Sequence, residues 1–366
     1  MRRRRFLAAA AAAGLAPSAM AASAPLRLTL LGQSLIQHDL RGQVWAGRAA
    51  LTDLLKGGDV VFSDLETALR SPGAGPPTRE PLLLHAAPVE ALDSLMALGV
   101  TLLATANNHA WDLGTAGVAA ALAPLDARGL THAGTGVDLA AAAAPAVQVT
   151  PHGRVALVAA ATGAIRPGAA ATAERPGVNE LRRGSDGALN AEDLGRVLDA
   201  VVRAGKSAEV VMLYHHNHDW EPDNAVTPGW QKELAHRAVA AGASLFASHG
   251  APRLHGIEVY RGAPIFYDLG NFIFQTRTRD DRYGPEAWEG VVVACDFREG
   301  RFRQAALTPL VLNGEATDNP DDLATRGRPA IADPSRGRAI LRRLETLSRP
   351  YGTHLRPAGD RLVLLP

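Results

Sequence analysis

The sequence of 366 residues has one cysteine, Cys295, so no disulfide can form within the chain. Stability must therefore come from the hydrophobic core, and thiol chemistry is not expected. The chain also lacks an excess of either charge, because its 38 basic residues nearly balance its 37 acidic residues. No basic stripe with interleaved aromatic residues follows the first few positions, so we expect no nucleic-acid partner. Beyond the amino terminus, no uncharged stretch approaches the length of a membrane span.

The amino terminus has the composition of an export signal. A basic cluster is followed by an alanine-rich apolar stretch and by small residues suited to cleavage near Ala21 or Ala24. Residues 2–7, with the sequence RRRRFL, resemble a twin-arginine signal, a route that carries folded proteins. We therefore predict a signal peptide over residues 1–24 and a periplasmic or cell-surface location. An uncleaved membrane anchor is the alternative.

Apolar runs alternate with segments of helical spacing through most of the chain. The runs predict strands near residues 26–32, 59–66, 100–109, 154–163, 209–219 and 243–250. Alternation of strand and helix favours right-handed crossovers and mainly parallel sheets. From about residue 256 the pattern changes to strand, tight turn, strand. We therefore predict an α/β fold, a sandwich of two packed mixed sheets flanked by helices.

Titratable and amide side chains gather where the predicted strands end. Seven of the twelve histidines lie there: His38, His109, His215, His216, His218, His249 and His255. The binding crevice of an open α/β sheet forms at the carboxyl ends of its strands, so separate segments can converge in one site. Imidazole, carboxylate and carboxamide groups suit a divalent transition metal. A hydrolytic metal site is therefore the first hypothesis.

The most specific motif is TANNHAWDLG, in which Asn107, Asn108 and His109 end an apolar strand. A metal phosphoesterase can use such a strand end to give the metal an Asn oxygen and to aim a His at the leaving group. The alternative is a helix-capping loop, in which Asn108 or Asp112 only satisfies backbone donors.

Two further strands end in histidines or carboxylates. In YHHNHDW, alternation along the strand sends His216 and His218 to one side and His215 to the other. One of these can bind a metal and the others can contact substrate, unless they form only a surface cluster. Asp64 and Glu66 face the same side of their strand, so they can pair at a metal or merely complement a helix dipole.

Two more segments carry polar residues at strand ends. His249 ends a strand in SHGAPRLHGIE, and His255 precedes the next strand. Either histidine alone could be an ordinary loop residue. Asp268 and Asn271 in FYDLGN lie at a tight turn, where turn chemistry is the simpler interpretation.

These motifs, in this order, resemble the CapA-type capsule or poly-γ-glutamate synthesis proteins, which have a metallophosphatase-like fold. The resemblance runs from about Leu26 to Phe274 and includes VVFSDLE, LLATANNHAWDLGTAG, AGASLFASHGAPRLHGIEVY and GAPIFYDLGNFIF. It implies a metallophosphatase-like α/β/β/α sandwich over residues 25–312. Residues 313–366 are then expected to form a C-terminal extension packed on this domain.

The resemblance also implies a function and a set of site residues. We expect a metal-dependent hydrolase that acts on an anionic envelope polymer, such as polyglutamate, or on a phosphoester, with a membrane-bound polymer synthesis complex as a partner. One or two divalent ions (Mn, Zn or Fe) are expected at Asp64, Glu66, Asn108, His215, His216 and His249. We expect His109 and Asp112 to be catalytic, and Gln33, His38, His218, His255 and Asn271 to contact substrate.

The chain departs from the family pattern at two places. Gln33 stands where the family usually has the Asp of a Gly-Asp pair, so a charged ligand is missing there. Ala251 and Pro252 stand where the family commonly has Pro-His, which removes an imidazole. Asp64, in place of the usual Asn, could restore one anionic ligand. The alternative function is therefore a non-catalytic polymer-binding or assembly component with a partly lost metal site.

Overall fold

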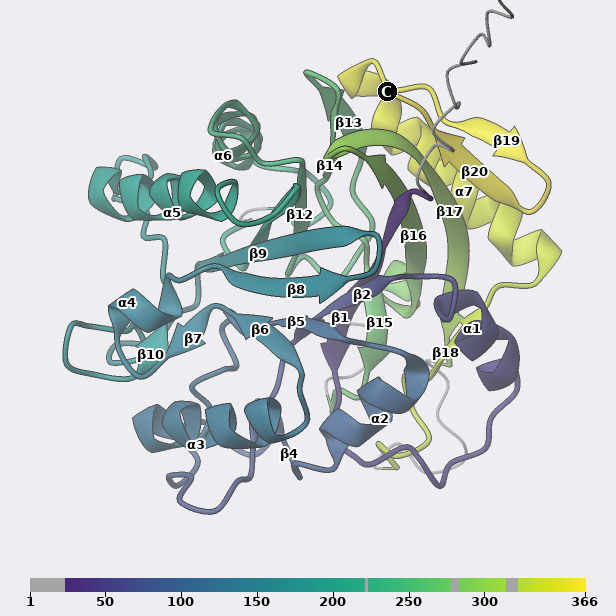
Figure 1. Cartoon of the computed structure of the whole chain (residues 1–366). Helices are drawn as coiled ribbons and strands as arrows, with labels where there is room; N and C mark the ends of the chain where they lie inside the picture. The colour runs from purple at the N-terminus through teal and green to yellow at the C-terminus, as the bar shows by residue number, and fades with distance from the viewer. Residues whose placement is uncertain (1–23, 221–222, 278–282, 314–321) are drawn as a thin grey trace, which may run out of the picture.

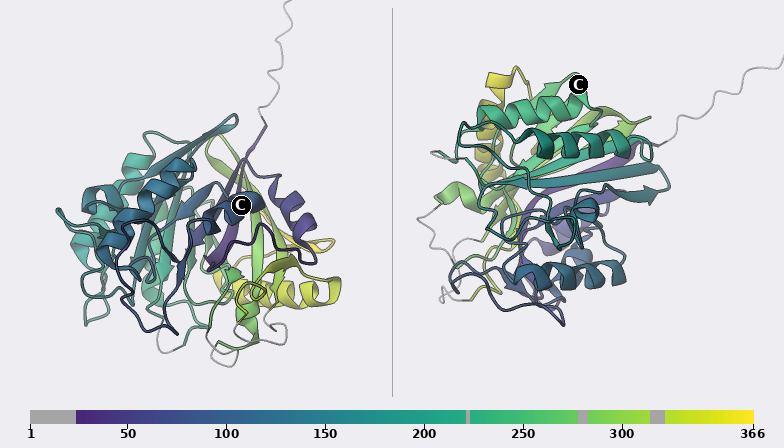
Figure 2. Two further views of the ribbon diagram at one scale, coloured as in Figure 1. Left: turned by 90° about the horizontal axis from the view of Figure 1, so that it is seen from below. Right: turned by 90° about the vertical axis from the view of Figure 1, so that its left-hand side faces the viewer.

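The computed structural model describes residues 24–220, 223–277, 283–313 and 322–366. The predicted signal peptide lies outside these ranges except for its last residue. Two mixed β-sheets pack face to face, with helices on both outer faces (Figure 1). This arrangement confirms the predicted α/β sandwich, and Figure 2 shows the same layers from two other directions.

The larger sheet has ten strands among the described residues, in the order β19-β20-β17-β16-β1-β2-β5-β6, with β15 beside β1 and β18 beside β17. The strands are β1 (Leu26–Leu35), β2 (Val60–Leu65), β5 (Leu102–Ala104), β6 (Thr131–Ala133), β15 (Asn271–Phe274), β16 (Glu289–Arg298), β17 (Arg301–Leu312), β18 (Pro329–Ile331), β19 (Arg356–Ala358) and β20 (Arg361–Leu364). Strands β1, β2, β5 and β6 run parallel, as expected for strands joined by helical crossovers.

The smaller sheet has the order β13-β14-β12-β11-β9-β8. Its strands are β8 (Ala146–Thr150), β9 (Gly153–Thr162), β11 (Val210–Asn217), β12 (Leu245–His249), β13 (Ile257–Tyr260) and β14 (Ala263–Phe266). The four central strands are parallel, and hairpins add an antiparallel strand at each edge. Two short pairs complete the strands: β3 (Ala68–Leu69) with β4 (Ala86–Ala87), and β7 (Thr135–Gly136) with β10 (Gly177–Val178).

Three apolar layers hold the sandwich together. Leu30 and Phe62 of the larger sheet meet Tyr214 of the smaller sheet in the core between the sheets. Helices α1 (Arg48–Leu55), α2 (Ala91–Leu98) and α3 (Gly114–Ala127) cover the outer face of the larger sheet, and α5 (Ala191–Ala204) and α6 (Gly229–Ala240) cover that of the smaller sheet. Short α4 (Leu139–Ala142) precedes β8. Because apolar layers cover both faces of each sheet, the central strands are nearly continuous apolar runs.

The C-terminal segment is built into the same sheet and core. Strands β18 and β20 pair with β17, and β19 pairs with β20. Helix α7 (Pro334–Ser348) buries Ile340 and Leu344 in the core between the sheets. Arg336 and Arg343 of this helix bind the buried carboxylate of Glu289 on β16. Among the described residues, no helix is long and apolar enough to cross a membrane.

Candidate metal and acid–base site

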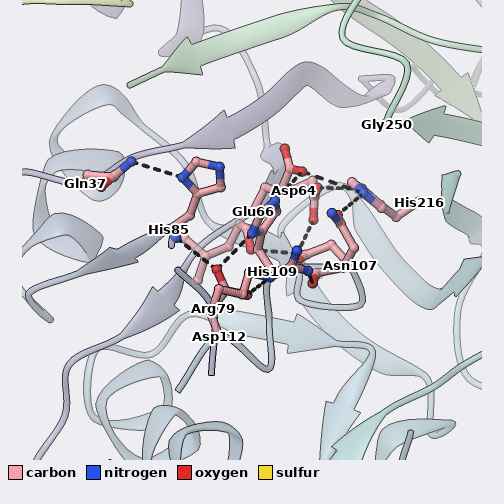
Figure 3. A network of polar contacts seen from close by, with 12 residues as sticks. Gln37, Asp64, Glu66, Arg79, His85, Asn107, His109, Asp112, His216 and Gly250 are labelled. Atoms are coloured by element: carbon pink, nitrogen blue, oxygen red, sulfur yellow. Dashed lines mark hydrogen bonds and ion pairs between the residues drawn. The ribbon is translucent and has the colours of Figure 1, made fainter. Parts of the chain in front are cut away.

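The carboxyl ends of four strands bring a polar cluster together between the two sheets. Strands β2 and β5 contribute from the larger sheet, and β11 and β12 contribute from the smaller one (Figure 3). The cluster consists of Asp64, Glu66, Asn107, Asn108, His109, Asp112, His216 and His249, all of which are at most 7% exposed. The convergence of separate strand ends therefore agrees with the expectation from the sequence.

His216 lies at the centre of this polar cluster. Its Nε2 atom is 2.8 Å from Oδ1 of Asn108 and 3.7 Å from Oε1 of Glu66. On the other side of the ring, Nδ1 is 3.2 Å from Oδ2 of Asp64. His216 is paired in register with His249 on the neighbouring strand, so the two imidazoles lie on the same face of the sheet. Residues of the larger sheet thus surround the imidazole of His216, which comes from the smaller sheet.

Both carboxylate oxygens of Asp64 are already engaged. Oδ1 accepts a hydrogen bond of 3.1 Å from Nδ2 of Asn107, and Oδ2 faces Nδ1 of His216. A carboxylate in this position fixes the orientation of a ligating imidazole. The geometry therefore favours an orienting role for Asp64 over the direct ligand role expected from the sequence. Asn107 also donates to the carbonyl of Leu65 and accepts from the backbone N–H of His109, which ties β2 to the loop after β5.

His109 and Asp112 form a dyad beside the carboxylate of Glu66. Nδ1 of His109 is 2.9 Å from Oδ2 of Asp112, and Nε2 points toward Oε1 of Glu66 at 4.0 Å. Asp112 is fully buried and also accepts hydrogen bonds from Nε of Arg79 and from the backbone N–H of His85. The carboxylate therefore orients the imidazole of His109, as acid–base catalysis requires.

Burial shifts the acid–base equilibria of the dyad and its neighbour. Burial, together with the charges of Asp64 and Asp112, raises the pKa of Glu66 well above its ordinary value. Burial, together with the guanidinium of Arg79, lowers the pKa of His109 well below its ordinary value. A neutral His109 that donates from Nδ1 to Asp112 carries a free lone pair on Nε2. This nitrogen can therefore accept a proton.

Several buried polar atoms in or beside the polar cluster have no hydrogen-bond partner. These atoms are Oε2 of Glu66, Nε2 of His249, Oε1 of Gln33 and Oδ1 of Asn271. The other ring nitrogen of His249, Nδ1, is 3.3 Å from the hydroxyl of Tyr214. If that nitrogen donates its proton to Tyr214 and Glu66 is ionised, all four unpartnered atoms are acceptors. Buried acceptors without donors are costly, and a cation would satisfy them.

The donors around His216 can be compared with the geometry of a metal site. Among the described residues, no three His, Cys, Asp or Glu side chains form by themselves a group that could hold a metal ion. The carboxamide oxygen of Asn108 lies beside Nε2 of His216 and could complete a mixed set of donors. Two ligands at about 2.1 Å from one ion are about 3.0 to 3.4 Å apart. The distances of 2.8 Å and 3.7 Å from Nε2 of His216 to Asn108 and Glu66 bracket that separation.

Along the end of β11, His216 and His218 lie on one side of the strand and His215 on the other, as alternation predicts. His215 is therefore not part of the polar cluster. Its Nε2 atom is 2.9 Å from the hydroxyl of Thr162, and its ring packs against Trp230 under helix α6. The expectation that His215 binds the metal is therefore wrong, because it faces the opposite side of the sheet from His216. The ring of His218 stacks on that of His216, with 6.3 Å between centroids, so His218 adjoins the cluster.

The remaining expected substrate contacts lie in different surroundings. His255 is buried, with Nδ1 on Thr227 and Nε2 on the carbonyl of Asn224. Both ring nitrogens are engaged, so the expected substrate contact of His255 is corrected to a structural role. His38 is half-buried, and its backbone N–H donates to the side chain of Gln275. No described residue forms a hydrogen bond with its imidazole, so the expected substrate contact of His38 stays a prediction.

Gln33 lies between Asp64 and Asn271 in the register of the larger sheet. Asn271 donates from Nδ2 to the carbonyl of Ala287, which leaves its oxygen unpartnered. Asp268 accepts from the backbone N–H groups of Gly270 and Ala251, as turn chemistry predicts. The uncharged Gln33 thus occupies an interior position beside the carboxylate of Asp64.

The loop after β12 fits tightly against the end of β11. Gly250, directly after His249, has a φ of +122°. A Cβ atom at this position would lie 2.1 Å from the carbonyl oxygen of Asn217. Only glycine combines this conformation with this close approach. Gly250 therefore sets where β12 ends and so positions His249, its last residue.

Four residues beside the polar cluster were not predicted from the sequence as site residues. They are Gln37, Arg79, His85 and Tyr214. Arg79 and His85 belong to a loop with no strand-end signal, and they become neighbours of Asp112 only through the fold. Tyr214 could have been found, because it lies two residues before His216 and therefore shares its face of the strand.

Comparisons with known proteins agree with the motifs. The family model described as bacterial capsule synthesis protein PGA_cap matches residues 27–276. A "Probable polyglutamine synthesis accessory protein" of Mycobacterium tuberculosis (strain ATCC 25618 / H37Rv) is 33% identical over 83% of this chain and 76% of that protein. "PGA biosynthesis protein CapA" of Bacillus subtilis (strain 168) is 32% identical over 63% of this chain and 56% of that protein.

Similarity extends to a solved structure. A hypothetical protein from Thermus thermophilus matches with a TM-score of 0.44 and 17% identity, over 77% of this chain and 97% of that one. The PGA_cap match is the informative one, because it spans the strands that supply every member of the polar cluster. This chain therefore belongs to the PGA_cap family of CapA-like bacterial capsule synthesis proteins.

Proposed function

We propose that this protein is a metal-dependent hydrolase that acts on an anionic envelope polymer or a phosphoester. The observation that carries the proposal is the continuous series of buried acid–base groups from Asp112 through His109 and Glu66 to His216. Buried titratable groups with shifted pKa values that face one another are typical of catalytic sites. A purely structural core would place apolar side chains in this position.

One divalent ion is proposed between Glu66, Asn108 and His216, with His249 as a further donor. The unpartnered oxygen of Glu66 and the unpartnered nitrogen of His249 support this assignment, as do the distances around Nε2 of His216. Mn, Zn and Fe all accept this mixture of imidazole, carboxylate and carboxamide. Such an ion would supply positive charge to stabilise the negative charge that develops on a substrate oxygen.

His109 is proposed as the group that moves the proton. Its neutral ring accepts a proton from the attacking water at Nε2 while Asp112 holds Nδ1. The resulting imidazolium then returns that proton to the leaving oxygen, which completes hydrolysis with no net change in the enzyme. Asp112 orients the ring, and Arg79 holds Asp112 in place by a hydrogen bond to its other oxygen. The general-acid role expected for His109 thus becomes the second half of a proton exchange.

The names of the relatives support an envelope polymer as the substrate class. One relative is named for PGA biosynthesis, and a "Capsule biosynthesis protein CapA" of Bacillus anthracis is named for capsule biosynthesis. Another is named as a probable accessory protein of polyglutamine synthesis. We extend this to a polymer of the same kind for this chain, handled outside the cytoplasm alongside a membrane-bound synthesis complex. Hydrolysis there would trim or release the polymer.

Export by the twin-arginine route is part of this proposal. Replacing Arg3 and Arg4 together by Lys should leave a longer precursor in the cytoplasm, because the signal depends on the arginine pair. Cell fractionation and immunoblotting measure the distribution. A matched variant with Arg2→Lys and Arg5→Lys controls for charge. Normal export and processing of the Arg3→Lys and Arg4→Lys variant would contradict the route.

A non-catalytic polymer-binding component is the second candidate. Gln33 favours it, because this residue places an uncharged amide with an unpartnered oxygen where the family resemblance leads us to expect an Asp. The intact dyad of His109 and Asp112 favours the enzyme, because a buried carboxylate that orients an imidazole for proton transfer is typical of acid–base catalysis. The two candidates differ in whether the unaltered protein turns over an ester.

Paired variants test the enzyme. His109→Asn should lower kcat for bis(4-nitrophenyl) phosphate by roughly 100-fold or more and leave metal content unchanged. His216→Ala should lower both metal content and activity. His236→Ala is the matched control, because His236 is partly exposed and bonded to Glu258 away from the cluster. Equal activity and equal metal content in all three variants and the unaltered protein would refute the proposal.

A further inference from the structure

His85 lies beside the acid–base dyad and has no role in the proton exchange described above. The centroid of its ring is 4.1 Å from that of His109, and its backbone N–H donates to Asp112. Figure 3 shows His85 between Gln37 and His109, on the side of the dyad away from His216. The residue as a whole is buried, with 5% of its surface exposed.

Gln37 determines which nitrogen of His85 carries the proton. Nε2 of Gln37 donates to the backbone carbonyl of Gln275 at 2.6 Å, which fixes the orientation of the amide because a carbonyl only accepts. The same Nε2 atom is 3.1 Å from Nδ1 of His85. An amide N–H only donates, so Nδ1 of His85 accepts. The proton of the neutral imidazole is therefore on Nε2.

The Nε2–H group of His85 is free to donate to a ligand. Among the described residues, none accepts a hydrogen bond from this group. Nε2 of His85 is also not one of the fully buried polar atoms that lack a partner, so the atom is partly exposed. The group therefore reaches solvent-accessible space beside His109. Burial, with a contribution from His109, lowers the pKa of His85 well below its ordinary value, which keeps the ring neutral. The guanidinium groups of Arg79 and Arg277 act on the same ring and favour an anion nearby.

We propose that His85, held as the Nε2–H tautomer by Gln37, donates a hydrogen bond to an anionic oxygen of the substrate next to His109. A phosphoryl or a carboxylate oxygen fits this donor equally well, and each accepts strongly from an N–H group. The substrate in this statement rests on the proposed hydrolase function, whereas the tautomer does not. His85 would thus hold the anionic part of the polymer while His109 moves the proton.

The tautomer can be measured without any substrate. Long-range proton–nitrogen correlation spectra of protein labelled with 15N-histidine distinguish the two neutral tautomers. The signals of His85 are identified by their loss in His85→Phe. We expect the Nε2–H tautomer near neutral pH, and a mixture of tautomers in Gln37→Met, which removes the donor. An Nδ1–H tautomer or a charged ring in the unaltered protein would overturn the proposal.

Binding of two probes tests the donor itself. His85→Phe keeps a ring against His109 but has no N–H, whereas His85→Gln places an amide N–H near the position of Nε2. Calorimetric titration should show inorganic phosphate or γ-glutamylglutamate bound roughly 10- to 100-fold more weakly by His85→Phe. His85→Gln should stay within about threefold of the unaltered protein. Equal affinities in the unaltered protein and His85→Phe, or no binding of either probe by the unaltered protein, would overturn the proposal.

The same measurements separate this proposal from the enzyme assignment. Binding that depends on His85, in a protein that does not hydrolyse the chromogenic ester, would reject the hydrolase and keep His85 as an anion donor. Hydrolysis with KM and phosphate inhibition unchanged in His85→Phe would reject the donor and keep the hydrolase. The probe that binds more tightly identifies the oxyanion class.

Discussion

Asp112→Asn should destabilise the fold through the charge of Arg79. Oδ2 of Asp112 accepts from both His109 and the backbone of His85, and Oδ1 accepts from Arg79 at 2.5 Å. An asparagine keeps one oxygen, which best serves the two donors on one side. Its NH2 group then faces the guanidinium, donor against donor, and the 15% exposed side chain of Arg79 loses its counter-ion.

The magnitude follows from the burial of this pair. Breaking a buried ion pair by removing one charge costs about 3 to 5 kcal/mol. At about 2 °C per kcal/mol for a chain of this size, the melting temperature should fall by roughly 6 to 10 °C. Denaturant titration and calorimetry measure both quantities. Asp126→Asn is the matched control, because its 75% exposed carboxylate should cost less than about 1 kcal/mol.

A double-mutant cycle identifies the cause. Asp112→Asn combined with Arg79→Met removes the unpaired charge, so the double variant should be more stable than the sum of the single effects predicts. We expect a coupling free energy of about 2 to 3 kcal/mol. Additive effects, within about 0.5 kcal/mol, would refute the argument that the unpaired guanidinium is the source of the loss.

Three further predictions concern residues around the polar cluster. Tyr214→Phe removes the hydroxyl on Nδ1 of His249 and should weaken metal binding by about 10-fold or more with little loss of stability, and an unchanged metal affinity in equilibrium dialysis would contradict this. Gln33→Asp adds a charge beside Asp64 and should raise the metal stoichiometry measured by elemental analysis, whereas an unchanged value would favour the binding-protein candidate. Burial raises the pKa of Asp268 to about 8, so the folded state binds the extra proton and stability should fall as pH rises from about 4 to about 8. That slope should be shallower in denaturation of Asp268→Asn, because the remaining slope comes from other buried carboxyl groups such as Glu66.

The strand ends could be predicted from the sequence because the apolar runs show where each buried strand stops. An apolar run that stops at a polar residue gives the end of a buried strand, and parallel strands end at the same edge. Asp64, Asn108, His216 and His249 were found in this way. The alternation along β11 also separated His215 from His216, although it did not decide which of them faces the other sheet.

The sequence could not give the contacts that assign roles within the polar cluster. Asp64 orients His216 because Asn107 occupies its other oxygen, and that contact joins residues 43 positions apart. Arg79 and His85 lie in a loop without periodicity, so no pattern relates them to Asp112. Tertiary hydrogen bonds of this kind depend on how two sheets pack, which spacing along one strand does not record.

Anomalous diffraction from crystals of the purified, metal-loaded protein is the decisive test of a metal ion at His216. Data collected at the absorption edge of the bound metal locate the ion without any assumption about activity. We expect one peak between the two sheets, about 2.0 to 2.3 Å from Nε2 of His216 and in contact with Glu66 and Asn108. A metal peak elsewhere, or none at this position, would contradict the proposed metal site.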